Sequence, residues 1–483
     1  MTQLIGKFFK LLLVVYVFFF AFMWWRPIPE VLTHPTQTYH VSDKSVRFYS
    51  DLEHIDKKGV LLETNTIVTR YRELIKNAQH SVLAGAYRIP PQAVASGTQN
   101  LTDILESKHA ESKHVAMAVV TDPINTLYGG LPSESMEQLR KNGVFIVQTD
   151  MNAMPDGDLL YTSFWRPFIS WWGNSINGGW LVSPIEANGT KVTLRSWLSF
   201  LNTKANESKF LITDAVDTKS KNGDAKLISY ILSSDLADPL GASGKVALEV
   251  DDGLWSDLLA RQGAIGDIAS APLPSFAMTN INPEQGGALK VSLLGVATTR
   301  KTLITKIEGL HPHDQLDITS RFISDRDIIS ALKSAAGRNV IIRVVLDPND
   351  SLFNFQLLGI PNLPVGKELS DSASGGIEVR YCDAHALPCT SRLIVGRSAS
   401  STFLVLGSAD LTRKDTAGFN IESVVLVEAP SDFTAAKDAT VYFNKIWNNE
   451  GGVYTVDYNV RADQTLWKSS VYRIMERTGI TLY

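Results

Sequence analysis

The sequence predicts a mixed α/β fold in two similar lobes behind one N-terminal transmembrane helix. Three observations lead to this prediction. Short apolar, β-branched runs alternate with segments of helical periodicity, as in parallel βαβ units. The pattern of strands and polar turns recurs after roughly 200 residues, which indicates an internal duplication. A long apolar run occupies most of residues 8–25.

The apolar run is suited to crossing a membrane. No charged residue lies between Leu11 and Trp25, and aromatic residues before Lys10 extend the run to residues 8–25. A helix of that length spans about 27 Å, close to the hydrocarbon thickness of a bilayer. A cleaved signal peptide is the alternative, but no small-residue cleavage site follows the run. We therefore expect an uncleaved single-pass anchor, a cytoplasmic tail at residues 1–7 and a main domain on the periplasmic or extracytoplasmic side.

The length of 483 residues predicts two folded units rather than one core. Residues 26–60 begin with several prolines and are expected to form a stalk and lead-in. Glycine and proline mark residues 264–287 as the crossover between lobes. The first lobe would then occupy residues 61–263 and the second residues 288–483.

Composition excludes several classes of function. A net charge of −4 provides no general attraction to nucleic acid, so such a partner is disfavoured. Two cysteines, Cys382 and Cys389, are too few for a disulfide scaffold or a cysteine-rich zinc site. They could pair in an oxidising compartment or remain free thiols. No histidine pattern indicates a metal site, and no nucleotide-binding fingerprint is present, so we expect no metal and no cofactor.

Each lobe is predicted to alternate helices with strands. In the first, helices are expected at 66–77, 101–106, 135–142 and 192–200, and strands at 81–87, 115–120, 144–148, 209–213 and 226–232. In the second, helices are expected at 303–310 and 328–336, and strands at 318–322, 340–346, 393–395, 403–406 and 421–427. Residues 151–185 are irregular and rich in aromatic residues, which we interpret as core rather than as a membrane-docking patch.

Polar turns follow corresponding strands in the two lobes. Asp122-Pro123-Ile124-Asn125 ends one strand as Asp347-Pro348-Asn349-Asp350 ends its counterpart. Likewise, Ser233-Ser234-Asp235-Leu236 stands where Gly407-Ser408-Ala409-Asp410-Leu411 stands in the second lobe. Open α/β sheets bind ligands at the carboxyl ends of their strands, so these turns are candidate binding loops.

The second half closely resembles a membrane-associated bacterial subgroup of the phospholipase D superfamily. The segments that carry the resemblance are Ser324-Asp325-Arg326, Leu346-Asp347-Pro348-Asn349, Gly359-Ile360-Pro361-Asn362 and Gly407-Ser408-Ala409-Asp410-Leu411-Thr412-Arg413. The resemblance covers roughly residues 60 to 460. It implies a duplicated fold with one His-x-Lys-x-x-x-x-Asp motif per lobe in a shared cleft. In that family one histidine attacks phosphorus and the other protonates the leaving alcohol, while the lysines hold phosphate oxygens.

Both motifs are degenerate in this sequence. The motif positions are Glu207, Lys209 and Asp214 in the first lobe and Thr390, Arg392 and Arg397 in the second. Glu207 and Thr390 therefore replace the two histidines, and Arg397 reverses the charge of an aspartate. Because both imidazoles are missing, we expect no intact catalytic residue. His385 could enter the site if its loop were remodelled, although a structural role is favoured.

The residues that remain could still hold an anion. The phosphate-binding candidates are Lys209, Ser233, Ser234, Arg392, Ser408 and Asp410. An equally weighted alternative is that Lys209–Asp214 and Arg392–Glu422 are buried structural ion pairs.

The sequence therefore favours a pseudoenzyme that binds a phosphate or phospholipid headgroup, or scaffolds a protein partner, at the membrane lipid bilayer. A phospholipid phosphodiesterase or phosphatidyl transferase with a rearranged site is the alternative.

Overall fold

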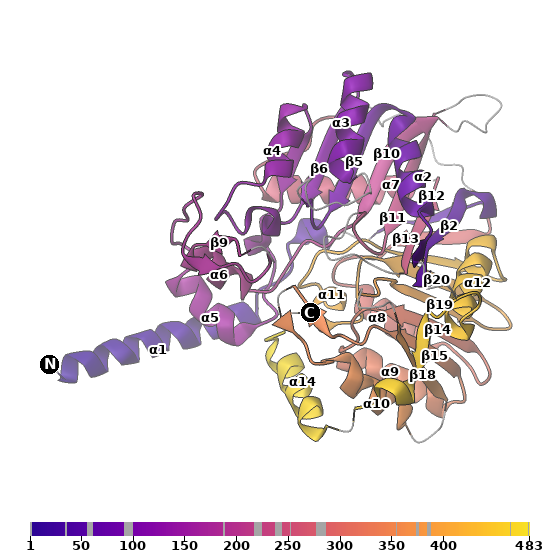
Figure 1. The fold of residues 1–483 in the computed structure, drawn as a ribbon. Helices are drawn as coiled ribbons and strands as arrows, with labels where there is room; N and C mark the ends of the chain where they lie inside the picture. Colours follow the sequence, from indigo (N-terminus) through magenta and orange to yellow (C-terminus); the bar gives the residue numbers. More distant parts are fainter. Residues whose placement is uncertain are drawn as a thin grey trace.

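Two large β-sheets form the body of the molecule, and one long helix, α1 (Thr2–Trp24), projects from it (Figure 1). The computed structural model describes residues 2–33, 36–55, 61–90, 100–186, 189–216, 225–236, 244–251, 253–276, 286–353, 355–372, 376–383, 388–463, 465–481 and 483. Within them, α1 alone is long and apolar enough to cross a membrane. The prediction of a mixed α/β fold behind one apolar helix is confirmed.

The first sheet has seven strands, and the second has nine. In spatial order the first contains β2 (Val46–Asp51), β12 (Lys245–Val250), β11 (Ala225–Leu232), β10 (Phe210–Val216), β5 (Ala78–Ala86), β6 (Ala116–Thr121) and β7 (Phe145–Gln148). The second contains β1 (Thr38–Val41), β13 (Leu289–Leu293), β21 (Val424–Ala429), β20 (Thr402–Gly407), β19 (Leu393–Arg397), β14 (Gln315–Ser320), β15 (Ile341–Leu346), β18 (Ile377–Cys382) and β22 (Thr455–Asp457).

Six strands have the same order and the same pairing directions in both sheets. In the first sheet β5, β6 and β7 are parallel, and β10, β11 and β12 continue antiparallel on the other side of β5. In the second, β14, β15 and β18 are parallel, and β19, β20 and β21 continue in the same way. Strands β10 and β19, which follow the two degenerate motifs, therefore occupy matching central places.

The two sheets pack face to face over a shared apolar core. Side chains alternate across a strand, so Phe210 and Ile212 of β10 enter this core while Leu211 faces the outer side. In β19, Leu393 and Val395 enter the shared core while Ile394 faces outward. The arrangement brings the starts of β10 and β19 to one region between the sheets.

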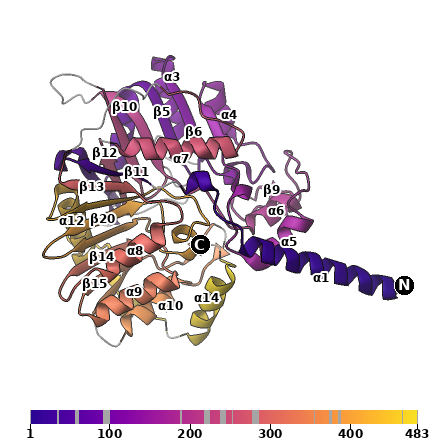
Figure 2. The ribbon, with the colours of Figure 1, turned by 180° about the vertical axis from the view of Figure 1, so that it is seen from behind.

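Helices cover the outer faces of both sheets (Figures 1 and 2). Those of the first sheet are α2 (Thr66–Lys76), α3 (Leu101–Glu111) and α4 (Glu134–Lys141). Those of the second are α8 (Thr299–Glu308), α9 (Arg326–Gly337), α10 (Asn362–Ser370) and α14 (Leu466–Thr478). Helices α7 (Leu254–Ile268) and α12 (Thr434–Asn448) contribute to the shared core. The remaining helices are α5 (Leu159–Phe168), α6 (Leu194–Phe200), α11 (Arg413–Thr416) and α13 (Tyr458–Arg461).

Three two-stranded ribbons complete the described elements. They pair β3 (Glu53–Ile55) with β4 (Leu61–Glu63), β8 (Leu181–Val182) with β9 (Lys191–Val192), and β16 (Ser351–Leu352) with β17 (Phe355–Gln356).

Three local predictions differ from the structure. Residues expected in a stalk instead form β1 and β2, which pair with β13 and β12 and so bring the lead-in chain into both sheets. The segment expected to be irregular contains α5, whose start is capped by Asp158. Helix α7 continues to Ile268, inside the expected crossover, because its apolar face packs in the shared core. The lobe boundaries themselves remain predictions.

The two cysteines form a disulfide. Cys382 ends β18, and Cys389 lies one residue before Thr390. The disulfide therefore ties the segment that leads into β19 to the neighbouring part of the second sheet. His385 falls within residues 384–387, outside the described part of the chain.

Candidate functional site

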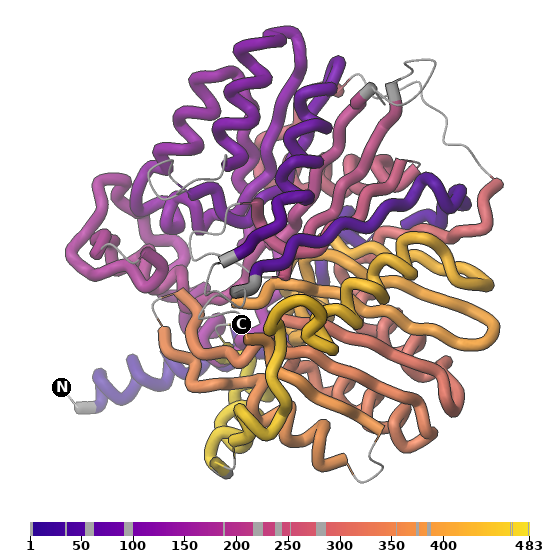
Figure 3. The backbone as a smooth tube through the Cα atoms, turned by 45° about the vertical axis from the view of Figure 1, so that its right-hand side comes forward, coloured from indigo at the N-terminus to yellow at the C-terminus, as the bar shows by residue number. Residues whose placement is uncertain are grey.

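A pocket between the two sheets contains parts of both degenerate motifs. The described residues that line it are Tyr87, Arg88, Glu207, Lys209, Ser234, Asp235, Arg321, Phe322, Leu352, Phe353, Thr390, Arg392, Asp410, Asp415 and Tyr483. Most of the indigo-to-magenta part of the chain lies in one half of the molecule, and the orange-to-yellow part lies in the other (Figure 3). The structure thus brings Lys209 and Arg392 together from opposite halves of the sequence.

The two motifs enter the pocket in matching ways. Asp122, after β6, accepts a hydrogen bond from the backbone N–H of Asn206 at 2.7 Å. Asp347, after β15, accepts one from the backbone N–H of Cys389 at 2.8 Å. Each bond holds the residue directly before the former histidine position. The polar turns after these strands therefore support the motif backbone, and neither aspartate is among the residues that line the pocket.

The first motif is also bonded to the opposite sheet. The backbone N–H of Glu207 donates to the carbonyl of Ile421 at 2.9 Å. The N–H of Lys209 donates to Ser423 Oγ at 3.0 Å. These contacts join segments more than 200 residues apart in the chain. Hydrogen bonds between the two sheets therefore hold this wall of the pocket in place.

Lys209 and Glu207 form a local pair at the edge of the pocket. Lys209 Nζ lies 3.3 Å from Glu207 Oε2 and 5.5 Å from the centre of the Tyr87 ring. The Glu207 side chain is 24% exposed, whereas that of Lys209 is 5% exposed. Water can therefore reach the carboxylate more easily than the ammonium group.

Arg392 is more fully enclosed. Its guanidinium forms an ion pair with Asp410 at 2.7 Å and donates to the carbonyl of Ser233 in the other lobe. Burial alone would lower the pKa of Arg392, but the charge and hydrogen bond of Asp410, together with the charges of Glu207 and Glu422, raise that pKa. Asp410 also accepts two backbone N–H bonds, from Arg321 and Phe322. Asp410 therefore positions Arg392, and the place of Asp410 among the candidate phosphate ligands stays a prediction.

The last positions of the two motifs lie outside the pocket lining. Asp214 accepts bonds from the backbone N–H groups of His80 and Ser81 and contacts His80 Nδ1 at 2.7 Å. Arg397 pairs with Asp317 at 2.9 Å. Each charge has therefore acquired a structural partner on its own sheet. Within the described residues, neither the Lys209–Asp214 nor the Arg392–Glu422 ion pair forms.

The three candidate serines differ in their availability. Ser233 Oγ accepts the N–H of Val246, and Ser408 Oγ donates to Glu422 and accepts the N–H of Ser423. The Ser233 and Ser408 hydroxyls therefore stabilise the backbone of their turns. Ser234 lines the pocket, and its buried hydroxyl has no hydrogen-bond partner among the described residues. Of the three, Ser234 is the one whose hydroxyl could meet a ligand.

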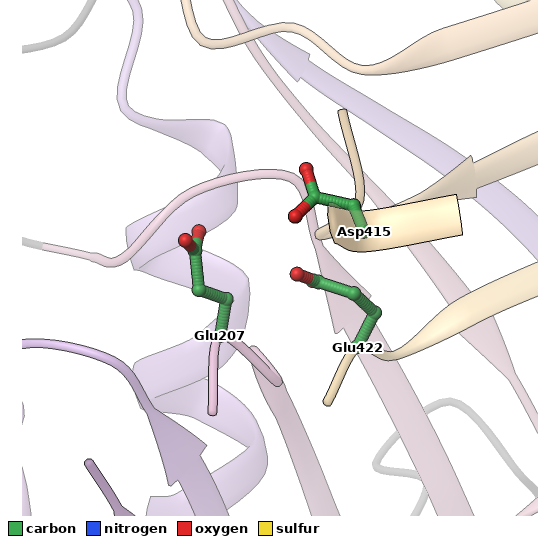
Figure 4. A group of neighbouring side chains, drawn as sticks. All are labelled: Glu207, Asp415 and Glu422. Carbon is green, nitrogen blue, oxygen red and sulfur yellow. The ribbon is translucent and has the colours of Figure 1, made fainter. Parts of the chain in front are cut away.

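Three carboxylates converge beside the pocket, as Figure 4 shows for Glu207, Asp415 and Glu422. Their nearest oxygen atoms all lie within 4.8 Å of one another. Burial, reinforced by Glu207 and Asp410, raises the pKa of Asp415 to about 7. Burial, reinforced by Asp415 and Glu207, raises the pKa of Glu422 well above its ordinary value. The cluster therefore retains a proton near neutral pH. Its spacing could also suit a metal ion, but carboxylates alone are no evidence for one.

Two arginines that sequence reasoning missed also line the pocket. Arg88 pairs with Glu186 at 2.8 Å and lies over the Phe353 ring. Arg321 lies 5.3 Å from the centre of the Phe322 ring, and its guanidinium forms no ion pair within the described residues. Each follows the carboxyl end of a central strand, β5 or β14. That location, where α/β sheets place their ligands, is the sequence signal that could have identified them.

One family of known proteins matches part of this chain in sequence. Residues 305–447 match the family model described as "Cardiolipin synthase, PLD-like domain". The matched stretch, residues 305–447, is similar to the phospholipase D superfamily. The match lies in the second half of the chain. No curated protein sequence matches this phospholipase D-like chain.

One solved structure shares its fold with most of the chain. The phosphatidylserine synthase of Haemophilus influenzae Rd KW20 is similar at a TM-score of 0.52 and 10% identity, over 93% of this chain and 96% of that one. Polyphosphate kinase from Porphyromonas gingivalis aligns at a TM-score of 0.46 and 10% identity, over 91% of this chain. The alignment spans about half of that kinase, 54% of its chain. At this level of identity the likeness to the synthase shows the fold alone.

Proposed function

We propose that this protein is a membrane-anchored, non-catalytic phospholipase D-like protein whose pocket binds a phosphate-bearing headgroup. The observation that carries the proposal is the convergence of Arg88, Lys209, Arg321 and Arg392 in one pocket that has no histidine among its described lining residues. Without an imidazole, neither the attack on phosphorus nor the protonation of a leaving alcohol has its usual agent. Guanidinium groups remain good ligands for phosphate oxygens.

Arg321 is the principal phosphate ligand in this proposal. Lys209 and Arg392 are already paired with Glu207 and Asp410, and Arg88 is paired with Glu186. A phosphate that approached them would compete with those carboxylates. Arg321 forms no ion pair among the described residues. The Asp347 carboxylate, on which its charge acts, is already bonded to the backbone N–H groups of Asn349 and Cys389. The Ser234 hydroxyl on the same lining can donate to a phosphate oxygen. The two sheets would therefore each contribute one polar group to the ligand.

The pocket would lie outside the cytoplasm. Lysines precede the apolar run of α1, and the positive-inside rule keeps such a segment in the cytoplasm. The Cys382–Cys389 disulfide supports this orientation, because disulfides persist in oxidising compartments. The matching strand order of the two sheets supports the proposed internal duplication.

Binding of glycerol phosphate to the detergent-solubilised full chain tests the proposal. Titration calorimetry should detect binding, and Arg321→Ala should weaken it by about tenfold, since loss of one charge-assisted bond costs about 1.4 kcal/mol or more. Arg140→Ala is the matched control, because Arg140 lies on α4 and pairs with Glu137. Equal affinity in wild type and Arg321→Ala would contradict the role of Arg321, and absence of binding would contradict the pocket.

A rearranged phosphodiesterase or phosphatidyl transferase is the second candidate. The pKa of Asp415, about 7, favours it, because a group that titrates near neutrality can act as a general acid beside the Glu207 carboxylate. Phosphodiesterase assays on phospholipid and nucleic-acid substrates, with Glu207→Ala and Thr390→Ala, separate the candidates. We expect no turnover in the wild type. Turnover that is lost in Glu207→Ala would overturn the non-catalytic proposal, whereas turnover that survives both changes comes from another source.

A further inference from the structure

An exposed apolar segment lies beside the membrane helix. Seven large apolar side chains in residues 159–182 are exposed to solvent: Leu160, Phe164, Trp171, Trp172, Ile176, Trp180 and Val182. Trp171 and Trp180 are 73% and 72% exposed. Soluble surfaces rarely concentrate such residues, and tryptophan prefers the membrane–water interface. We call residues 159–182 the apolar shoulder.

The apolar shoulder is fixed to the end of α1. The Tyr16 hydroxyl donates to the carbonyl of Leu160 at 3.1 Å, and Met23 is buried at 4% exposure. Arg26, directly after α1, donates to the carbonyl of Ala153 at 3.1 Å. Figures 1 and 2 show α5 at the base of α1. Because these contacts fix α5 against α1, the depth of α1 in a bilayer also sets the depth of α5.

The position of Tyr16 sets the depth of this contact. Tyr16 precedes Trp24, the last residue of α1, by eight residues (24 − 16 = 8). At 1.5 Å per residue the contact lies about 12 Å from that end of the helix, toward the bilayer interior. An α1 that spans a bilayer therefore carries the start of α5 below the headgroup layer.

The charges of the segment are compatible with such burial. Within residues 159–182 the sequence contains one charged residue, Arg166. Its guanidinium pairs with Asp156 at 2.7 Å. Asp158, just before the segment, caps α5 by accepting the N–H of Tyr161 at 2.9 Å. Paired charges and a capped helix start leave the exposed face of α5 apolar.

We propose that the apolar shoulder is inserted into the lipid bilayer beside α1, as a second membrane contact of this chain. The occupant of the exposed face is lipid, because the docking of α5 along α1 continues the surface that α1 itself presents to lipid. This contact also approaches the pocket. Tyr161 donates to the carbonyl of Leu198 in α6, and Phe200 of α6 packs on Phe353 of the pocket lining with ring centres 6.0 Å apart.

Site-specific fluorescence tests the proposal in the full chain reconstituted in phosphatidylcholine nanodiscs. The two native cysteines are joined in a disulfide, so a single introduced cysteine can be labelled selectively with a polarity-sensitive dye. Phe164→Cys, Trp171→Cys and Trp180→Cys are the test positions. Val441→Cys on α12 and Trp467→Cys on α14 are matched controls, since both are exposed apolar residues on other elements.

We expect blue-shifted emission at the three test positions and loss of fluorescence when the acyl chains carry nitroxide groups, with neither effect at the controls. Equal, weak quenching at test and control positions would overturn the proposal. Energy transfer between dyes on two chains, without quenching by the lipid nitroxide, would assign the surface to a second copy and also overturn it. A lipid-borne photoreactive carbene provides a check without mutation, because it should label residues 159–182 of the wild type. None of these results depends on phosphate binding by the pocket.

Discussion

The starts of β10 and β19 are equivalent in backbone and different in chemistry. Asp122 and Asp347 hold the two segments with the same type of hydrogen bond, one residue before Glu207 and Thr390. Their cations nevertheless differ, because Lys209 has a partly exposed partner and Arg392 a buried one. The backbone hydrogen bonds that support the site therefore do not depend on which side chains the two segments carry. The two segments keep the same backbone support although their side chains and charge partners differ.

The largest expected effect comes from removing each of the two cations, Arg392 and Lys209, in separate variants. Arg392→Met should lower the free energy of unfolding by about 3–5 kcal/mol, because it leaves the buried Asp410 charge uncompensated. Lys209→Met should cost about 1 kcal/mol, since water can solvate the more exposed Glu207. Thermal unfolding of the detergent-solubilised full chain measures both changes. Equal costs would show that the two lobes enclose their cations alike.

A smaller effect should come from the carboxylate cluster and should depend on pH. The pKa of Glu422 is raised in the folded protein, so the folded state holds its proton more tightly than the unfolded state does. The stability that the Glu422 proton contributes is therefore fully present below the ordinary pKa of a glutamate and is lost as pH rises through the folded pKa. Glu422→Gln cannot ionise, and its amide can replace both the accepting oxygen and the unpartnered one.

We expect Glu422→Gln to be close to wild type in stability at acidic pH and more stable by about 1–3 kcal/mol at alkaline pH. Melting curves across this pH range measure the difference, with Glu450→Gln as the control at an exposed position. A constant difference at all pH values would show that Glu422 does not hold the proton of the cluster.

The smallest effect should be found at Arg397, the charge-reversed motif position. Asp317 retains Arg343 at 2.7 Å when Arg397 is removed, so Arg397→Ala should cost at most about 1 kcal/mol. Asp214→Ala should cost more, about 1–3 kcal/mol, because it leaves backbone N–H groups at His80 and Ser81 without their acceptor. Unfolding measurements on Arg397→Ala and Asp214→Ala compare how much each residue stabilises its own lobe. Arg397→Ala as the costlier variant would contradict it.

Much of the fold was accessible from sequence because its signals are local. Helix α2 and strands β6, β11 and β15 lie within a few residues of their predicted ranges, since hydrophobic periodicity specifies them. β1 and β2 were missed, because edge strands in a lead-in segment gain their pairing from distant partners. Helix α5 was missed since its aromatic residues obscured a helical pattern that Asp158 begins.

The sequence by itself determined the apolar N-terminal helix, the alternating α/β elements and the presence of Glu207 and Thr390 at the two motif positions, because each is written in neighbouring residues. Only the tertiary structure decided that Arg392 pairs with Asp410 rather than Glu422, that Arg321 lines the pocket, and that Glu207 meets Asp415 and Glu422. These contacts join residues far apart in the chain. Their partners depend on how two sheets pack across a common core, and that geometry is not contained in any local pattern.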